Sequence, residues 1–386
     1  MKDRLIIRGG RVLMPGGNIV ECDLEITDGI ISGFEPEVSA GKEIDAKGAF
    51  VLPGIVDIHT HGIGHNSASD GNLKDYAEFE AKKGATAFVP TFFAPPATIA
   101  EQMRRHRRET DELGLLPQVV GFRLESPYLD HAGGGLSGDT TEINRNITEM
   151  LLDAGGGHIK IWDISPDLPG AADEVAYISS KNIICSIAHT FATIEQARAA
   201  VDSGARLVTH LFDTFQSPPH VKGGVYPVAL TDYLLVEDRV TCEIIGDGTH
   251  VDPILVEKTF RCKTDTRMVF VTDSNLGAGL APGRYTLPGG WGDVMIAGPN
   301  DGVRLIDRDM GLSGSALTPI DSFRNAIRLF GKDMGTASRV CSETPAKLLG
   351  LNKGRIEKGM DGDIIILGPE LDLKYTISGG SVIFKA

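Results

Sequence analysis

The stretch Ile55-Val56-Asp57-Ile58-His59-Thr60-His61 is a short apolar run that ends in two histidines. Side chains alternate along a β-strand, so His59 and His61 face the same side of it. Neutral imidazoles at this spacing suit Zn, Fe, Ni or Cu. Pro53-Gly54 precedes the run and Gly62 follows it. The stretch therefore predicts a strand that ends in part of a metal site.

Seven further runs of the same kind follow, separated by segments with helical character. They are Ala85–Thr91, Val119–Glu125, His158–Ile164, Ile183–His189, Arg206–His210, Val240–Asp247 and Met268–Asp273. Strands that alternate with helices predict a parallel sheet, and eight such units predict closure into a (β/α)8 TIM-like barrel. We expect helices at 73–83, 97–113, 194–203, 320–329 and 338–349, and a hairpin excursion in the Gly/Pro-rich segment 283–306.

Both ends of the chain are rich in short β-segments with turn signals, such as Asp28-Gly29 between two apolar runs. We predict a small β-sandwich domain made from residues 1–51 and 350–386, with the barrel domain, residues 52–349, inserted between them. The full length of 386 residues suits a barrel plus a smaller domain.

Composition narrows the class of protein. The net charge is −14 and Lys/Arg-rich runs are absent, which argues against nucleic acid and anionic membranes as partners. The cysteines number five and form no Cys-x-x-Cys, so we expect free thiols in a reducing, cytoplasmic setting. The sequence has no apolar run near the roughly 18 residues that span a bilayer, and no signal peptide is expected.

Several runs end in residues that bind or assist a metal. In a TIM barrel the C-terminal strand ends open onto one face, where active sites lie. Glu125, His189 and His210 would meet there as three ligands with one position open, which is the catalytic arrangement for zinc. Asp273, at the end of the eighth run, suits a general base and acid, although an aspartate there could also cap a helix. His250, beyond the seventh run, could polarise a scissile carbonyl.

The motifs resemble the amidohydrolase superfamily, and in particular its N-acetylglucosamine-6-phosphate deacetylase branch. The first is Val51–Gly62, which contains His59-Thr60-His61. The others are Leu124-Glu125-Ser126-Pro127-Tyr128, Ala188-His189-Thr190, Thr209-His210-Leu211-Phe212-Asp213, Asp247-Gly248-Thr249-His250, Val271-Thr272-Asp273, Leu312–Thr318, Thr344–Gly350 and Gly354–Gly359. They occur in the order of the branch and cover nearly the whole chain.

This resemblance implies a barrel with a β-sandwich and a metal-dependent hydrolase that removes an acyl group, acetyl above all, from an N-acylated amino sugar. It implies one or two divalent ions, zinc in the first place and Fe, Ni or Co as alternatives, in a cytoplasmic homodimer. A metal-bound hydroxide would attack the amide. The implied metal-site residues are Glu125, His189, His210 and Asp273, with His59 and His61 for a second ion. Asp273 would be the general base and acid. The implied substrate contacts are His250, Asp213, Thr214, His220, Lys222 and Leu312.

The chain departs from that branch around the substrate. The loop after the glutamate usually carries Gly-Ala-His, but residues 133–138 contain no histidine. Asp213 replaces a usual asparagine, and Val221-Lys222 stands nearest to a usual His-Arg pair. A carboxylate about 4 Å from a phosphate costs roughly 1 to 4 kcal/mol, and a lysine binds phosphate with less orientation than an arginine. These differences predict an amino-sugar substrate without the usual 6-phosphate.

Two alternatives remain open. A cyclic-amide hydrolase of the dihydroorotase or hydantoinase kind would use Lys160, modified, as a bridging ligand in place of Glu125. A barrel that binds without catalysis would fail to hold metal.

Overall fold

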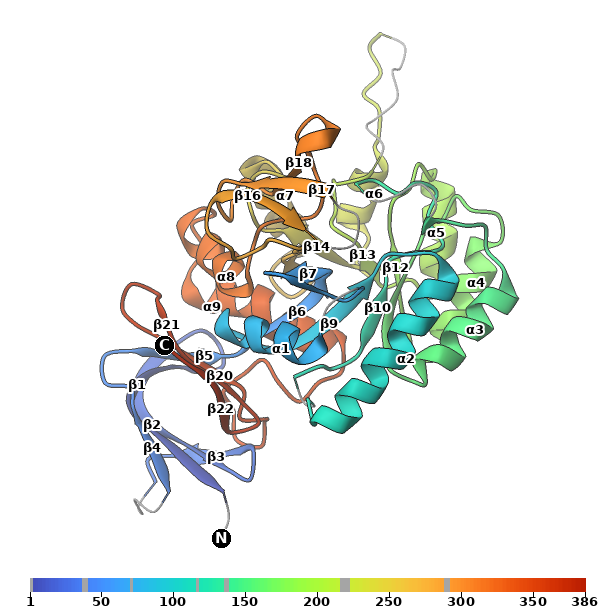
Figure 1. Ribbon diagram of the computed structural model, residues 1–386. Coiled ribbons are helices and arrows are strands. Elements are labelled where there is room, and N and C mark those ends of the chain that lie inside the picture. Colours follow the sequence, from blue (N-terminus) through green and yellow to red (C-terminus); the bar gives the residue numbers. More distant parts are fainter. Residues whose placement is uncertain are drawn as a thin grey trace.

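The computed structural model describes residues 3–36, 41–69, 72–115, 118–134, 139–215, 223–287 and 292–386. Its larger part is a barrel of parallel strands (Figure 1). Within the described residues the barrel strands are β6 (Ile55–Thr60), β9 (Ala85–Phe92), β10 (Phe122–Leu124), β11 (Ile159–Ile164), β12 (Ile184–Ile187), β13 (Leu207–Val208), β14 (Thr241–Ile245) and β15 (Met268–Val271). Each coincides with one of the eight predicted runs.

The barrel closes between its first and last strands. The sheet runs β15-β14-β13-β12-β11-β10-β9-β6, and a parallel bridge joins Thr60 to Ser274. The backbone N–H of Asp273 donates to the carbonyl of His59 (2.9 Å), and that of His61 donates to Ser274 (2.8 Å). This closure holds the ends of β6 and β15 side by side, and with them the two predicted site segments.

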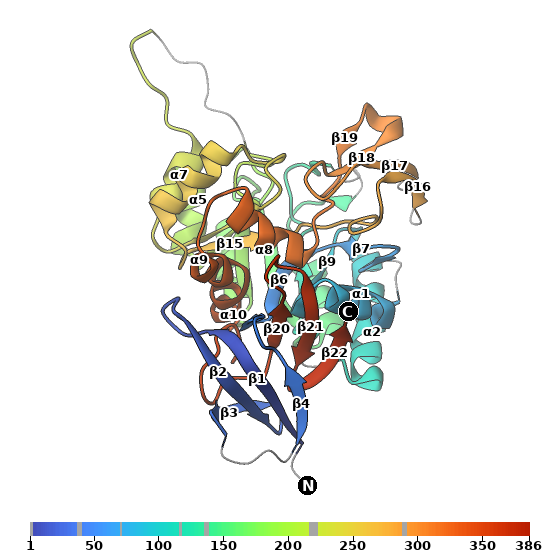
Figure 2. The ribbon, with the colours of Figure 1, turned by 90° about the vertical axis from the view of Figure 1, so that its left-hand side faces the viewer.

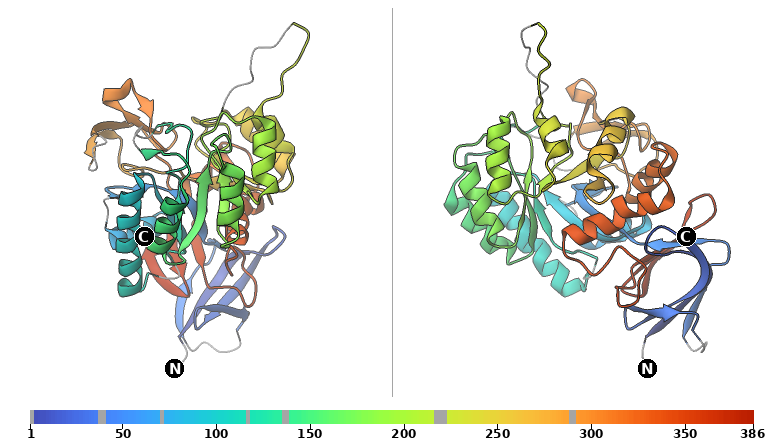
Figure 3. Two further views of the ribbon diagram at one scale, coloured as in Figure 1. Left: turned by 90° about the vertical axis from the view of Figure 1, so that its right-hand side faces the viewer. Right: turned by 180° about the vertical axis from the view of Figure 1, so that it is seen from behind.

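Helices alternate with the barrel strands and cover them on the outside (Figures 1 and 3). They are α1 (Leu73–Lys82), α2 (Pro96–Leu113), α3 (Arg145–Gly155), α4 (Ala171–Ser179), α5 (Ile194–Asp202), α6 (Leu230–Val236), α7 (Pro253–Lys263) and α8 (Pro319–Arg328). Side-chain caps begin several of them: Asn72 caps α1, and Thr193 forms a capping box with Gln196 at α5. The predicted helix over 338–349 is α9 (Met334–Ser338), a π-helical turn (Arg339–Glu343) and α10 (Thr344–Leu348).

The terminal segments form one sheet, as the sequence predicts for a small β domain. Its strands are β1 (Arg4–Leu13), β2 (Ile19–Thr27), β3 (Ile30–Phe34), β4 (Lys42–Asp45), β5 (Phe50–Pro53), β20 (Ile364–Leu367), β21 (Leu373–Ser378) and β22 (Ser381–Lys385). The sheet curls around its own apolar core at one end of the molecule (Figure 2). The chain leaves it between β5 and β6; the exact domain boundaries, 51/52 and 349/350, stay a prediction.

Two details of these segments refine the predictions. The Asp28-Gly29 hairpin is confirmed, since both residues have positive φ (50° and 82°), as a tight turn of this class requires. Gly9-Gly10, a glycine pair of the kind that usually signals a turn, lies inside a single strand, β1, with an irregular register between Ile7 and Gly10.

A second small sheet lies over the barrel end that carries the predicted site. It contains β16 (Gly283–Leu287), β17 (Gly292–Ile296), β18 (Val303–Leu305) and β19 (Gly311–Leu312), with a 3-10 turn at Ile306–Arg308, and a short pair, β7 (Gly62–Ile63) and β8 (Asn66–Ser67), lies nearby. This confirms the predicted excursion from 283 onward. In the described part of the chain, none of the helices has the length and apolar character that crossing a membrane requires. All five cysteines are free thiols.

Candidate metal centre and active site

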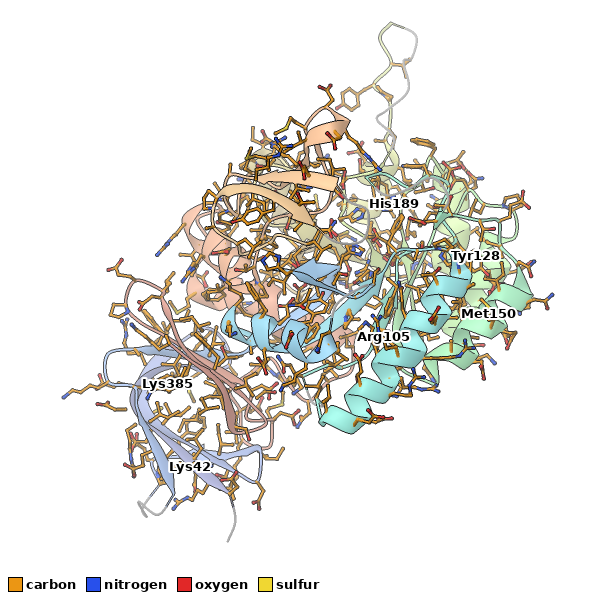
Figure 4. The ribbon with its side chains drawn as sticks, viewed as in Figure 1. Lys42, Arg105, Tyr128, Met150, His189 and Lys385 are labelled. Atoms are coloured by element: carbon orange, nitrogen blue, oxygen red, sulfur yellow. The ribbon has the colours of Figure 1, made fainter. Side chains whose placement is uncertain are left out.

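The predicted ligands converge at the C-terminal ends of the barrel strands. Glu125 follows β10 and lies in the middle of the group. Its Oε1 is 2.9 Å from Nε2 of His189 and 3.1 Å from Nε2 of His210. Its Oε2 is 2.8 Å from Nε2 of His61 and 3.5 Å from Nε2 of His59. Figure 4 shows His189 over the barrel, on the side away from the terminal sheet.

Two overlapping trios in this group have the geometry for an ion. One is Glu125, His189 and His210, and the other is His59, His61 and Glu125; in each, the candidate ligand atoms all lie within 4.8 Å of one another. Three ligand groups leave a coordination position for water or substrate, as in catalytic zinc sites. Imidazole and carboxylate donors fit zinc and other first-row divalent metals. Glu125 belongs to both trios, so its carboxylate could bridge two ions.

The protonation equilibria of these residues favour a cation in the centre. Burial raises the pKa of Glu125, but the facing His59 and His61 outweigh it and hold that pKa well below the usual range. Burial lowers the pKa values of His61 and His210, but hydrogen bonds and the charge of Glu125 raise each to about 10. The carboxylate therefore draws protons onto His61 and His210, whereas burial lowers the pKa of His189. A divalent cation would supply the same positive charge, so the donor set fits a metal.

Asp273 lies beside both trios. Its Oδ1 is 3.3 Å from Nε2 of His59 and 3.3 Å from Nε2 of His61. Burial raises the pKa of Asp273, but the neighbouring histidines lower it to about 2, so the carboxylate is ionised. It does not cap a helix: in the described chain the next helical segments are the 3-10 turn at Ile306–Arg308 and α8, whose N-cap residues are Leu305 and Thr318. The helix-cap interpretation of Asp273 is therefore wrong.

The strand ends that carry these residues have unusual backbones. His189, His210 and Asp273 have φ values of 40°, 25° and 46°. Non-glycine residues in this region cost of order 1–3 kcal/mol each, and such strain gathers at active sites. Each of these residues lies two positions beyond the end of an apolar strand.

His250 is anchored by the loop in which it lies. Asp247 Oδ1 accepts the backbone N–H groups of Thr249 (2.8 Å) and His250 (2.9 Å), and Asp247 Oδ2 lies 2.6 Å from His250 Nδ1. Burial lowers the pKa of His250, but the hydrogen bond with Asp247 raises it above the ordinary value. With Nδ1 bound to Asp247, Nε2 is the ring nitrogen left for a substrate.

A pocket opens over the metal trios. The described residues that line it include His61, Glu125, His189, His210, Asp273 and His250, together with Phe93, Asp213, Thr214, Asn275 and Leu312. The predicted contacts Asp213, Thr214, His250 and Leu312 are thus brought together. His220 and Lys222 lie outside the described residues. The described lining contains no lysine or arginine.

Lys160 is not part of this group. It is the second residue of β11, and an added Cβ on Gly121, before the start of β10, would lie 2.2 Å from its Cγ. Lys160 is therefore close to the start of its strand, whereas the trios lie beyond the strand ends. This position removes the structural basis of the cyclic-amide alternative.

The sequence predictions did not single out three buried residues beneath the site. Arg123, Asp163 and Glu243 form an ionic network inside the barrel, and Glu243 reaches His59. Their only signal in the sequence is that each interrupts an otherwise apolar strand run. Which partner each finds depends on strands that are far apart in the chain.

Comparisons with known proteins identify the family of this chain. A sequence model of the amidohydrolase family matches residues 50–383. The N-acetylgalactosamine-6-phosphate deacetylase of Escherichia coli O157:H7 is 29% identical over 377 residues, covering 96% of each chain. The N-acetylglucosamine-6-phosphate deacetylase of Lysinibacillus sphaericus is 27% identical over 395 residues, covering 98% of this chain and 97% of the relative.

Solved structures show the same architecture over the full chain. A variant of N-acetyl-D-glucosamine-6-phosphate deacetylase from Mycobacterium smegmatis, in complex with N-acetyl-D-glucosamine-6-phosphate, superposes with a TM-score of 0.86 at 25% identity and covers 100% of both chains. These comparisons confirm the predicted fold and family. The chain belongs to the amidohydrolase family.

Proposed function

We propose that this chain is a metal-dependent hydrolase that removes the acetyl group from an N-acetylated amino sugar phosphate. This proposal rests on the imidazole and carboxylate side chains that converge on one pocket. They are His61, His189, His210, His250, Glu125 and Asp273. The named activities of the full-length relatives support the substrate class. The proposed ligands are Glu125, His189 and His210 for one ion, and His59 and His61 with the shared Glu125 for another.

The residues around the pocket divide the work of amide hydrolysis. A bound divalent metal supplies a Lewis acid that polarises the amide carbonyl and lowers the pKa of water. Asp273 is ionised and faces the same space, so it takes the proton of the attacking water and then delivers it to the departing nitrogen. His250 offers Nε2–H to the oxygen on which negative charge develops. Asp213, Thr214 and Leu312 would contact the sugar.

A substrate screen tests the proposal. The purified chain is incubated with N-acetylglucosamine and N-acetylgalactosamine, each with and without a 6-phosphate, and acetate release is measured together with metal content. We expect acetate release that is lost on chelation and restored by added metal. Release from neither of the two 6-phosphate sugars by the metal-loaded chain would contradict the proposal. Zinc as the metal, the homodimer and the cytoplasmic location stay predictions from the sequence.

The first prediction concerns Asp213 and the phosphate. The sequence predicts a substrate without 6-phosphate, whereas the names of the relatives favour the phosphorylated sugar. Asp213 lines the pocket, so its charge would oppose a bound phosphate. We expect Asp213→Asn to raise the kcat/KM ratio of phosphorylated over unphosphorylated sugar by at least about fivefold, the effect of roughly 1 kcal/mol.

The wild-type kcat/KM ratio of phosphorylated over unphosphorylated sugar decides whether the substrate carries the 6-phosphate. A wild-type preference for the phosphorylated sugar of a hundredfold or more, about 2.7 kcal/mol, contradicts the expectation drawn from Asp213. An unchanged ratio in Asp213→Asn would show that this carboxylate does not face the phosphate.

The second prediction concerns pH. The hydrogen bond with Asp247 raises the pKa of His250, so its Nε2 keeps a proton to higher pH. If that proton is required, kcat/KM falls as the pH rises through this pKa. Asp247→Asn removes the carboxylate, so we expect the alkaline limb of the kcat/KM profile to move to lower pH. A profile whose alkaline limb stays in place would assign that limb to another group.

A further inference from the structure

Beneath the metal centre lies an ionic network that belongs to neither trio. Arg123 is fully buried, and its guanidinium contacts four other strand segments. It donates to Asp163 Oδ1 and Oδ2 (3.1 and 3.0 Å from Nη2), to Glu243 Oε1 (2.5 Å from Nη1), to the carbonyl of Ile58 (3.2 Å) and to Thr209 Oγ1 (2.9 Å). The side chain is therefore held from all sides.

Glu243 connects this network to the site. It comes from β14 and is also fully buried. Its Oε2 accepts from Nδ1 of His59 (3.2 Å) and from the backbone N–H of His210 (3.3 Å). Glu243 is in neither of the described trios that could hold an ion. One carboxylate thus contacts a residue from each trio without offering a ligand atom itself.

The contact with His59 decides which ring nitrogen can bind metal. A neutral imidazole has one nitrogen that carries a proton and donates, and one nitrogen with a free lone pair that accepts. An ionised carboxylate can only accept a hydrogen bond, so it pairs with the nitrogen that carries the proton. Glu243 therefore keeps the proton on Nδ1 and leaves the lone pair on Nε2. That Nε2 is the atom 3.3 Å from Asp273 Oδ1 and 3.5 Å from Glu125 Oε2. Histidine ligands are commonly oriented by such outer partners.

His59 differs in this respect from the other three histidines. Nδ1 of His61 faces the carbonyl of Thr91 (3.2 Å), and Nδ1 of His189 faces the carbonyl of His131 (3.0 Å). Among the described residues, Nδ1 of His210 has no hydrogen-bond partner. A charged acceptor forms a stronger hydrogen bond than a neutral carbonyl. His59 is thus the ligand whose tautomer is held most firmly.

Arg123 makes this arrangement possible inside the barrel. A buried carboxylate is costly unless it is paired and hydrogen-bonded. Arg123 meets both needs, because its Nη1 donates to Glu243 Oε1 (2.5 Å) and its Nη2 donates to Glu243 Oε2 (3.2 Å). Because Asp163, Ile58 and Thr209 fix the guanidinium, they also fix the carboxylate that it holds.

We propose that Glu243, held by Arg123, is a positioning residue that fixes the tautomer and orientation of His59 and thereby sets the metal affinity of the His59–His61–Glu125 trio. The inference rests on the proposed function in one respect, that this trio binds an ion. It does not depend on the identity of the substrate or on the acetyl group.

The test measures metal binding in Glu243→Gln. The glutamine amide has one acceptor oxygen and one donor NH2 group. In wild type both oxygens of Glu243 accept, from Arg123, His59 Nδ1 and the His210 N–H, and in the variant the NH2 group would face at least one of these donors. The matched control is Glu174→Gln, which changes a buried glutamate that pairs with Arg145 (2.8 Å) in the outer helices. His59→Asn serves as the benchmark. Zinc affinity and stoichiometry are read by competition with a chelator.

We expect Glu243→Gln to weaken binding at the His59 trio by about 10- to 100-fold, the range found for outer partners of metal ligands. The other trio should keep its affinity, and Glu174→Gln should match the wild type. A loss in His59→Asn with wild-type binding in Glu243→Gln overturns this inference alone. Equal zinc binding by the wild type and His59→Asn overturns both the second ion and the inference.

A second measurement needs no substitution at position 243. In the zinc-loaded chain labelled with 15N-histidine, the ring signals of His59 are identified by their loss in His59→Asn. We expect the ring proton on Nδ1, in a hydrogen bond to a carboxylate. A spectrum that places this proton on Nε2 overturns the inference.

Discussion

Glu125→Gln is expected to lower metal content and acetate release together, with activity reduced by about a thousandfold or more. Glu125 is the one carboxylate common to both trios, with Oε1 toward His189 and His210 and Oε2 toward His61. The neutral amide removes the negative charge and replaces one oxygen with a hydrogen-bond donor. Metal-ion catalysis is worth several kcal/mol, and about 4 kcal/mol corresponds to a thousandfold change in rate.

Metal content per chain and kcat/KM are measured on the same preparations. Lys160→Ala and Glu174→Gln are the controls, because the first tests the lysine-bridge alternative and the second a buried glutamate away from the pocket. Both should keep metal and activity. If Lys160→Ala empties the site while Glu125→Gln keeps its metal, the ligand assignment is wrong and the cyclic-amide interpretation returns.

The barrel could be predicted because its signals are local. Each strand is a short apolar run, and each unit repeats the same order of strand and helix, so eight runs could be found one at a time. The residue that follows a strand then lies at a known face of the barrel, which placed Glu125, His189, His210 and Asp273 before any contact was seen. The continuity of β1 through Gly9-Gly10 was not predicted, because glycine pairs usually signal a turn.

The ionic network beneath the site could not be predicted in the same way. Arg123 and Glu243 are 120 residues apart, and their contact depends on the register of β10 and β14 around the closed barrel. Glu243 and His59 are 184 residues apart. A charged residue inside an apolar strand shows that some partner must exist, since an unpaired buried charge is costly. The sequence does not show which of several strands supplies that partner.

Asp273→Asn is expected to lower kcat by roughly 10²- to 10⁴-fold, the usual contribution of a general acid or base. Asparagine keeps the size of the side chain and one acceptor oxygen, but it cannot take and return a proton. The trios Glu125–His189–His210 and His59–His61–Glu125 do not include Asp273, so we expect metal to be retained. A fall in kcat at constant metal content would therefore report on proton transfer alone. Glu125→Gln, in contrast, is expected to lower metal content and activity together.

The matched control for this variant is Asp363→Asn, which changes a buried aspartate paired with Lys353 (2.6 Å) beside the terminal sheet. It should leave kcat unchanged, because that carboxylate does not line the pocket. Loss of metal in Asp273→Asn would identify Asp273 as an essential ligand. Near-wild-type kcat with full metal would remove Asp273 from the chemistry. Proton transfer would then fall to His250 or Asp213, the other acid–base side chains among the described residues of the pocket that belong to neither trio.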